Sequence, residues 1–262
     1  MPGALTGFER RDFTHDGRAR PVWWGGAGPG VVVIHEIPGI TPSVAEFAQR
    51  LVDAGMSVAL PELVGTTGRP PTPTYIARSL LEVCISREFH CLAERRTSPV
   101  ADWLRALARD LHARAGGPGV GAVGMCFSGG FSLAMAVDES VVAPVMSQPS
   151  MPFPIGRRRK ADLGLDPADL DRIRDRTAAG QCGAIGLRFT HDAAVPPERF
   201  EALRRELGDG FIAVEIDSSP GNPYGIARRA HSVLTEELVD EEGHPTRAAL
   251  DQVIAFLRER LM

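Results

Sequence analysis

The chain has 262 residues and a formal net charge of −4, with 44% hydrophobic and 24% charged residues. This composition is typical of a soluble globular enzyme and gives no support for nucleic-acid binding. Apolar runs stay shorter than the roughly 18 residues of a membrane span, and residues 1–20 lack the apolar centre of a signal peptide. The four cysteines form no CxxC pair, which favours free thiols in a reducing compartment and predicts a cytoplasmic protein.

Predicted strands and helices alternate along the chain. Trp23 and Trp24 indicate an early edge strand, and apolar runs predict strands at 31–34, 57–60, 120–125, 141–146, 184–189 and 211–216. Amphipathic spacing predicts helices at 43–54, 99–115, 131–137, 167–178, 196–207 and 246–261. This alternation predicts an α/β fold with a mostly parallel central sheet and helices on both faces. We expect one domain over 1–262, with insertions at about 62–98 and 148–166 near the ligand-binding edge.

Cys126 is the main candidate for chemistry. It follows the apolar run 120–125 and precedes a helix-like stretch, and small residues surround it at Gly124, Ser128 and Gly129. A nucleophile at the tip of a sharp strand-to-helix turn needs such small neighbours, because larger side chains would meet the backbone. A buried cysteine that only packs is the alternative interpretation.

A cysteine nucleophile needs a base and a group that orients the base. In sheets of this kind the acid follows the nucleophile along the chain, and the histidine follows the acid. Asp192 lies just after the predicted strand 184–189, and His231 follows the last predicted strand. His191 and His244 compete with His231, but His191 adjoins Asp192 and His244 immediately precedes the last helix. Asp192 could instead be a turn or cap residue.

Glu36 follows the central strand 31–34 between apolar residues, where a charge serves solubility poorly. It could approach Cys126 and hold the thiol proton until substrate arrives, although an ion pair with an arginine is the alternative. The backbone N–H groups of Ile37 and Phe127 are the candidate donors for an oxyanion, since Pro38 has no N–H to offer.

These motifs resemble the dienelactone hydrolase family of α/β-hydrolases over about residues 28–260. The matching residues are His35-Glu36-Ile37-x-Gly39, Gly124-x-Cys126-x-Ser128-Gly129-Gly130, Asp192 with Val195-Pro196, and His231. The resemblance implies a metal-free hydrolase with a Cys126–His231–Asp192 triad. It also implies that a glutamate like Glu36 pairs with the resting thiol and moves aside when substrate binds.

The sequence departs from the family pattern in two places. Ser128 stands where the elbow usually has glycine, and no arginine follows His231 within the next four residues. In the family an arginine at that place clamps the substrate carboxylate. Arg87, Arg95 or Arg96 could supply a clamp instead. Phe153 and Tyr224 are further candidates for contact with substrate.

The sequence therefore predicts a hydrolase that cleaves a carboxylic ester or lactone through a thioester acyl-enzyme, with no cofactor and no metal. The expected partner is a small-molecule substrate, with neither nucleic acid nor membrane involved, and the oligomeric state is left open. An acyl or thioester transferase with the same triad is one alternative. A ligand-binding or redox-sensing protein on a hydrolase scaffold, with Cys126 as a sensitive thiol, is another.

Overall fold

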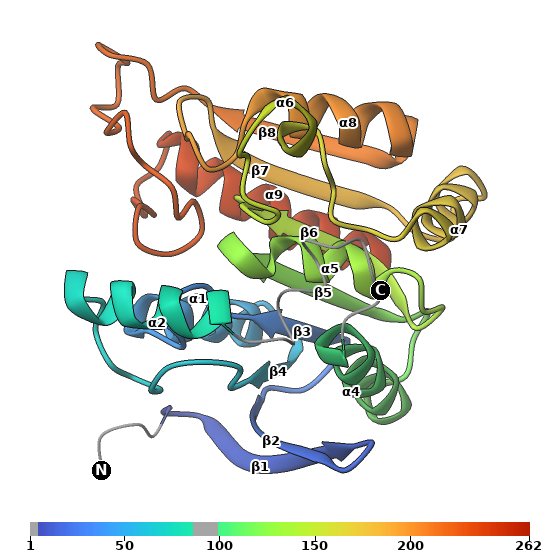
Figure 1. Ribbon diagram of the computed structural model, residues 1–262. Coiled ribbons are helices and arrows are strands. Elements are labelled where there is room, and N and C mark those ends of the chain that lie inside the picture. Colours follow the sequence, from blue (N-terminus) through green and yellow to red (C-terminus); the bar gives the residue numbers. More distant parts are fainter. Residues whose placement is uncertain (1–4, 86–98) are drawn as a thin grey trace.

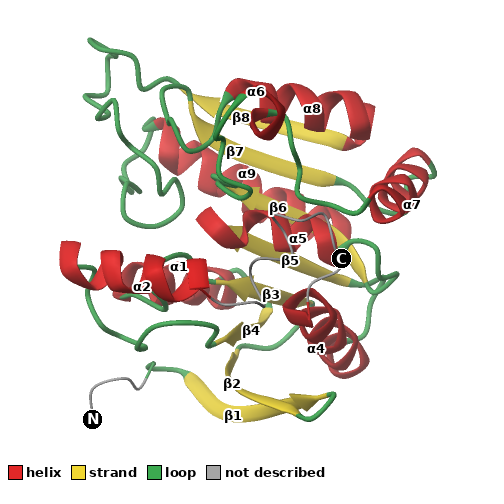
Figure 2. Cartoon of the chain, viewed as in Figure 1, coloured by secondary structure: helices red, strands yellow, loops and turns green. Residues whose placement is uncertain are grey.

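The computed structural model describes residues 5–85 and 99–262, whose strands form one eight-stranded sheet in the order β1-β2-β4-β3-β5-β6-β7-β8 (Figures 1 and 2). The strands are Phe8–His15 (β1), Arg18–Gly25 (β2), Gly30–Ile34 (β3), Ser57–Pro61 (β4), Val120–Met125 (β5), Val141–Ser147 (β6), Ala184–Phe189 (β7) and Phe211–Ile216 (β8). The strands β3 to β8 pair in parallel, whereas β1 and β2 pair antiparallel. The predicted mostly parallel sheet is confirmed.

Helices cover both faces of this sheet. They are Pro42–Asp53 (α1), Pro73–Ile85 (α2), Pro99–Ala115 (α4), Gly129–Met135 (α5), Arg157–Lys160 (α6), Pro167–Ala178 (α7), Pro197–Leu207 (α8) and Pro245–Leu261 (α9). Side chains alternate across β3, so that Val31 and Val33 pack in one core with α1 and α9. Val32 and Ile34 pack in the other core, together with residues of α4, α5, α7 and α8. Both faces of the central strands are therefore buried, as their continuous apolar runs predict.

The structure corrects the sequence prediction at the start of the chain. Trp23 and Trp24 do not lie at the edge, because β2 pairs with β4 on one side and with β1 on the other. The outer strand β1 was not predicted, because charged and apolar residues alternate only weakly along it and most of its residues are exposed. Charged side chains suit an edge strand, since they discourage pairing with another chain.

The segment 62–98 was predicted only as an insertion, but it contains α2. Residues 86–98, which include Arg87, Arg95 and Arg96, lie outside the described residues. The segment 148–166 connects β6 to α7 and carries only the short α6. Both segments start at the carboxyl ends of parallel strands, where the loops after β3, β5 and β7 also lie. In Figure 1 these loops, and the long connection after β8, gather on the left-hand side.

Candidate active site

The turn after β5 holds Cys126 in a strained backbone conformation. Its φ is +54°, in the left-handed region that non-glycine residues avoid, and the 3₁₀ turn Cys126–Ser128 leads directly into α5. A Cβ on Gly124 would lie 2.2 Å from the carbonyl oxygen of Ser128, and one on Gly129 would lie 2.7 Å from Cα of Pro149. Both positions therefore require glycine, as a sharp nucleophile turn demands.

Ser128, which departs from the family pattern, has a structural use in this turn. It is completely buried, and its hydroxyl accepts a hydrogen bond from the Met125 N–H at 2.8 Å. The same hydroxyl donates to the carbonyl oxygen of Ile34 at 2.8 Å. It therefore ties the turn to the end of β3, the strand that leads to Glu36 and Ile37.

The structure brings Asp192 and His231 to the same place as Cys126. The carboxylate Oδ2 of Asp192 lies 2.6 Å from Nδ1 of His231, and its Oδ1 accepts the Ala194 N–H at 2.9 Å. Asp192 is buried, whereas the side chain of His231 is 26% exposed and lines the same cavity as Cys126. Because Nδ1 faces the carboxylate, Nε2 is the nitrogen left for proton exchange with the thiol.

The imidazole of His231 strongly favours its protonated form. Burial alone lowers the pKa of His231, but the hydrogen bonds and charges of Asp192 and Cys126 outweigh burial and raise the pKa to about 11. A histidine held by a carboxylate next to a cysteine is the arrangement in which the imidazole can take the proton of the thiol.

Glu36 is buried after β3 and holds several loops together. Its carboxylate accepts hydrogen bonds from Ser232 Oγ at 2.7 Å, from Gln148 Nε2 at 3.2 Å and from Thr235 Oγ1. Burial raises the pKa of Glu36, and the hydrogen bonds from Thr235 and Ser232 offset part of that rise. Among the described residues, this carboxylate forms no ion pair with an arginine and no hydrogen bond with Cys126. Its partners are amide and hydroxyl groups.

The peptide between Glu36 and Ile37 is fixed from its carbonyl side. Its oxygen accepts hydrogen bonds from Nδ1 of His35 and from the Gly39 N–H, each at 2.8 Å. Nε2 of His35 in turn accepts the Leu63 N–H at 3.0 Å, which sets the ring tautomer. Because a trans peptide is planar, holding the carbonyl oxygen also fixes the direction of the Ile37 N–H.

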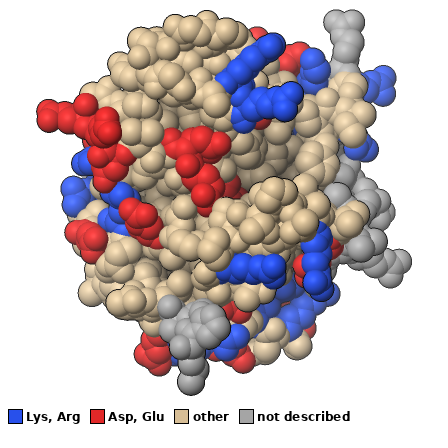
Figure 3. All heavy atoms as spheres, turned by 90° about the vertical axis from the view of Figure 1, so that its left-hand side faces the viewer, with Lys and Arg blue, Asp and Glu red and all other residues tan. Residues whose placement is uncertain are grey.

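Cys126, Asp192 and His231 all line one cavity of about 720 Å³ at the carboxyl edge of the sheet. Apolar residues from several loops and α2 supply much of its wall: Ile37, Pro71, Ile76, Leu80, Phe153, Ala193 and Ala194. Four lining residues in the described part of the chain carry carboxyl groups, namely Glu36, Asp192, Glu236 and Glu237, against a single guanidinium, that of Arg229. Figure 3, which faces this side of the molecule, shows acidic side chains gathered beside a hollow.

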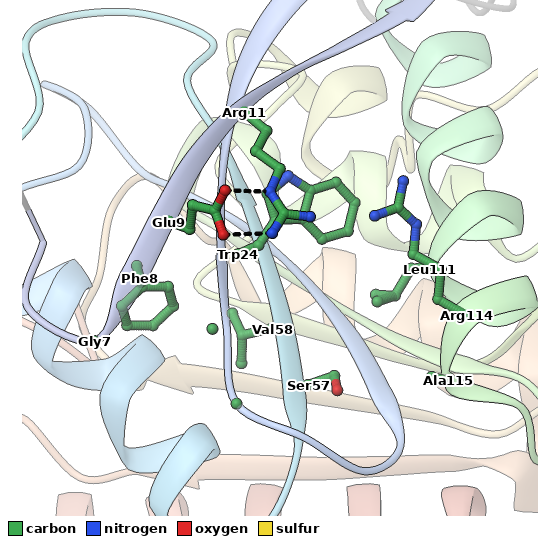
Figure 4. A pocket seen from close by; sticks show the side chains of 12 residues that line it. Gly7, Phe8, Glu9, Arg11, Trp24, Ser57, Val58, Leu111, Arg114 and Ala115 are labelled. Atoms are coloured by element: carbon green, nitrogen blue, oxygen red, sulfur yellow. Dashed lines mark hydrogen bonds and ion pairs between the residues drawn. The ribbon is translucent and has the colours of Figure 1, made fainter.

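A second cavity, of about 580 Å³, lies at the opposite edge of the sheet (Figure 4). Its lining includes Ser57 at the start of β4 and Ala115 at the end of α4. Arg11 is paired there with Glu9, and the guanidinium of Arg114 stacks on Trp24 at 4.6 Å from the ring centroid. Arg114 also pairs with Asp110 at 2.8 Å, and the lining holds no cysteine or histidine. The cavity with Cys126 is therefore the candidate active site.

The remaining sequence candidates fall in different places. Phe153 lines the cavity with Cys126. Tyr224 does not line it, because its ring is half exposed and packs edge-on against His244 at 5.4 Å between centroids. His244 caps α9 by accepting the Thr246 N–H, and His191 is hydrogen-bonded to Thr190, so neither pairs with Asp192. Arg87 lies outside the described residues.

Within residues 5–85 and 99–262, no group of three or more His, Cys, Asp or Glu side chains is arranged to hold a metal ion. No helix in this part of the chain combines the length and the apolarity needed to cross a bilayer.

Sequence reasoning missed several polar residues of the site. Ser150 lies 3.4 Å from the Cys126 sulfur, and Gln148, Ser232 and Thr235 bind Glu36. The sequence predicted no role for Ser232 and Thr235 beyond the absence of an arginine at their positions. The usable signal for Ser150 and Gln148 was their place directly after the strand 141–147, since that is the edge to which Cys126 and Asp192 were assigned.

Comparisons with known proteins agree with this fold. The structure resembles a dienelactone hydrolase of Anabaena variabilis (16% identity, TM-score 0.62, 98% of this chain and 100% of that chain covered). It also resembles a dienelactone hydrolase-like promiscuous phosphotriesterase from metagenomic libraries (17%, 0.64, 97% and 98%) and a cold-adapted esterase from an Arctic intertidal metagenomic library (16%, 0.59, 98% and 96%). No curated protein matches the sequence. The dienelactone hydrolase family matches residues 18–261, so the chain belongs to this family of ester and lactone hydrolases within the α/β-hydrolase superfamily.

Proposed function

We propose that this protein hydrolyses a carboxylic ester or lactone through Cys126 as nucleophile, His231 as acid and base, and Asp192 as the group that orients the imidazole. The observation that carries the proposal is the hydrogen bond between Asp192 and His231 in the same cavity as Cys126, which a strained turn holds at the carboxyl edge of the sheet. The fold family alone would leave the identity of the nucleophile open.

In the first half-reaction the thiolate of Cys126 attacks the carbonyl carbon, and the carbonyl electron pair moves onto the oxygen. The N–H groups of Ile37 and Phe127 stabilise that oxyanion, by about 3 kcal/mol for each donor in comparable sites. The imidazolium of His231 then gives its proton to the leaving alkoxide as the C–O bond breaks. This leaves an acyl group on sulfur as a thioester.

In the second half-reaction neutral His231 takes a proton from water, and the hydroxide attacks the thioester. The C–S bond breaks, the acid product leaves, and Cys126 returns as a thiolate beside the imidazolium. Asp192 keeps the Nδ1 proton of His231 in place throughout, so that Nε2 faces the reacting atoms.

Glu36 serves in this proposal as the anchor between the loop after β3 and the loop that carries His231. In the family a glutamate at this position pairs with the resting thiol. Here such pairing would require the carboxylate to leave Ser232, Thr235 and Gln148, which all bind it in the present conformation.

The experiment is burst kinetics with p-nitrophenyl acetate on the wild type, Cys126→Ala and Cys182→Ala. We expect a burst of one nitrophenol for each wild-type active site, because acylation by an activated ester is faster than hydrolysis of the thioester. Cys126→Ala should lose the burst and at least about a thousandfold in turnover, or ~4 kcal/mol of barrier.

Cys182→Ala is the matched control, because Cys182 is buried and burial raises its pKa to about 11, so its thiol is inert. Residual activity of Cys126→Ala within tenfold of the wild type would reject Cys126 as the nucleophile. An added alcohol or amine that captures the acyl group in preference to water would favour the transferase alternative.

A further inference from the structure

Ser150 touches the sulfur atom of Cys126. It lies three residues past the end of β6, its side chain is 2% exposed, and its Oγ is 3.4 Å from Sγ of Cys126. Its backbone N–H donates to the carbonyl oxygen of Cys126 at 3.0 Å. The two residues are therefore held together by a backbone and a side-chain contact.

The hydroxyl of Ser150 depends on that sulfur for a partner. Among the described residues, the contact with Sγ is the only hydrogen bond of its Oγ. Buried hydroxyl groups in proteins are nearly always hydrogen-bonded. A neutral thiol is a weak acceptor, whereas a thiolate carries a full charge and accepts strongly. The Ser150 hydroxyl thus makes its strongest hydrogen bond when Cys126 is ionised and accepts the O–H of Ser150.

Arg199, in the first turn of α8, binds the loop that carries Ser150. Its guanidinium is 1% exposed and donates to the carbonyl oxygen of Pro149 at 2.7 Å and to that of Pro152. Further hydrogen bonds go to the carbonyl oxygens of Asp162 and Arg159. Burial lowers the pKa of Arg199 to about 10, so the clamp stays charged at neutral pH. Both flanks of Ser150 are therefore fixed relative to the sheet.

We propose that Ser150 is a further catalytic residue, whose hydroxyl donates a hydrogen bond to the Cys126 thiolate, and that Arg199 is the residue that positions it. The inference rests on the proposed role of Cys126 as the nucleophile. When the thiol ionises, its proton passes to Nε2 of His231 and the negative sulfur accepts the Ser150 O–H. During acylation the S–C bond forms and the charge moves to the carbonyl oxygen, so the hydrogen bond weakens. It forms again when the C–S bond breaks and the thiolate is released.

The test measures the thiolate directly, without turnover. Iodoacetamide alkylates the ionised sulfur, with formation of an S–C bond and loss of iodide, and mass spectrometry of the peptide that contains Cys126 separates this site from the other cysteines. The rate is measured against pH for the wild type, Ser150→Ala and Ser150→Thr. Ser132→Ala is the matched control, since Ser132 is an equally buried serine whose hydroxyl donates to the carbonyl oxygen of Gly129.

The midpoint of the alkylation profile should rise by roughly one pH unit in Ser150→Ala, the shift expected when a charged acceptor loses one hydroxyl donor. Ser150→Thr keeps the hydroxyl and should return the midpoint toward the wild-type value. Ser132→Ala should leave it unchanged. At high pH, where the sulfur is ionised in every variant, the rates should converge. The charged and titratable groups that share the cavity with Cys126 stay the same in all variants: Glu36, His191, Asp192, Arg229, His231, Glu236 and Glu237.

A double-mutant cycle tests the part of Arg199. Arg199→Lys should raise the midpoint in the same direction as Ser150→Ala, and the double variant should show little more shift than Ser150→Ala alone, because both changes remove the same hydrogen bond. Additive shifts would show that Arg199 acts independently of Ser150. Ser150→Gly removes the same hydroxyl and replaces Ser150→Ala if that variant does not fold.

An unchanged midpoint in both hydroxyl-deletion variants would overturn the inference, as would an equal shift in Ser132→Ala. The proposed function can fail separately. If Cys126→Ala kept its hydrolytic activity, Cys126 would not be the nucleophile, whereas the alkylation profiles would still report whether Ser150 binds its sulfur.

Discussion

At the carboxyl edge of the sheet, Asp192 is bound to His231 beside the cavity that Cys126 also lines, whereas at the amino edge Arg11 and Glu9 are bound to each other. Both edges hold a sizeable cavity with charged side chains. The charges at the amino edge are exposed and compensated in pairs, and such pairs contribute little to stability or reactivity. At the carboxyl edge Glu36 and Asp192 are buried, and Asp192 is bound to the histidine that shares the cavity with Cys126. Burial and connection, rather than the presence of charge, distinguish the reactive edge.

The largest effect expected from breaking the connection is at Asp192. Asp192→Asn should lower kcat by about a hundredfold or more, because an amide can no longer hold the Nδ1 proton of His231 and the wrong tautomer then faces the substrate. Steady-state kinetics with a neutral ester would measure this loss. A decrease of less than about threefold would mean that His231 needs no orienting carboxylate, contrary to the expectation from comparable triads.

His35 shows how burial alone makes a group at this edge sensitive to acid. It is completely buried, and burial lowers its pKa from 6.5 to about 4. Between these pH values the unfolded chain binds a proton that the folded chain excludes. The stability that comes from keeping His35 neutral is therefore present above pH 6.5 and lost as the pH falls to 4, with a total of about 3 kcal/mol.

Urea denaturation from pH 7 down to pH 4 would measure this dependence. The free energy of unfolding should fall more steeply for the wild type than for His35→Asn, which cannot take up that proton but keeps a donor for the Glu36 carbonyl. His15→Asn, on the edge strand β1, is the control and should follow the wild type. Parallel curves for the wild type and His35→Asn would contradict the argument.

The acidic lining of the active-site cavity leads to a prediction about the charge of the substrate. None of the four residues after His231 is an arginine, and Thr235 among them is bound to Glu36. Four of the described lining residues carry carboxyl groups, against the single guanidinium of Arg229. A carboxylate buried without a guanidinium partner loses several kcal/mol of solvation. We predict that a lactone that bears a carboxylate is not preferred over its neutral analogue.

The ratio of kcat/KM for such a matched pair measures the preference. A hundredfold preference for the acid would demonstrate a clamp. Triple replacement of Arg87, Arg95 and Arg96 would then show whether these residues, which lie outside the described part of the chain, provide it.

The smallest effect is expected at the amino edge. Arg11→Ala should leave kcat/KM for a neutral ester within about twofold of the wild type, because its ion pair with Glu9 is exposed and screened by solvent. Loss of activity comparable to that of Asp192→Asn would show that the two edges are coupled, and the assignment of the site to one edge would need revision.

The parts predictable from sequence were those that local patterns determine. The apolar runs at 31–34 and 120–125 and the small residues around Cys126 indicated the parallel strands and the turn, because backbone crowding at Gly124 leaves a recognisable signature. Asp192 and His231 followed from their order along the chain. The edge strand β1 was not predictable, because its charged residues face solvent and it lacks the apolar pattern of a strand that packs in a core.

The polar contacts of the site lay beyond prediction for a different reason. Glu36 is bound by Ser232 and Thr235, about 200 residues away along the chain, and Ser150 contacts Cys126 from a loop that Arg199 binds. Serine and threonine are common surface residues, so their sequence gives no sign of such contacts. They depend on which loops meet at the edge of the sheet.

The most direct test of the account is the mass of the enzyme during turnover. After rapid mixing of the wild-type protein with p-nitrophenyl acetate and an acid quench within the burst, the protein should carry one additional acetyl group, and peptide mapping should place it on Cys126 as a thioester that hydroxylamine removes. The quench falls within the burst because the acyl-enzyme accumulates there. An acetyl group on another residue would contradict the central claim that Cys126 is the nucleophile, and so would steady hydrolysis with no acetylated protein at any time.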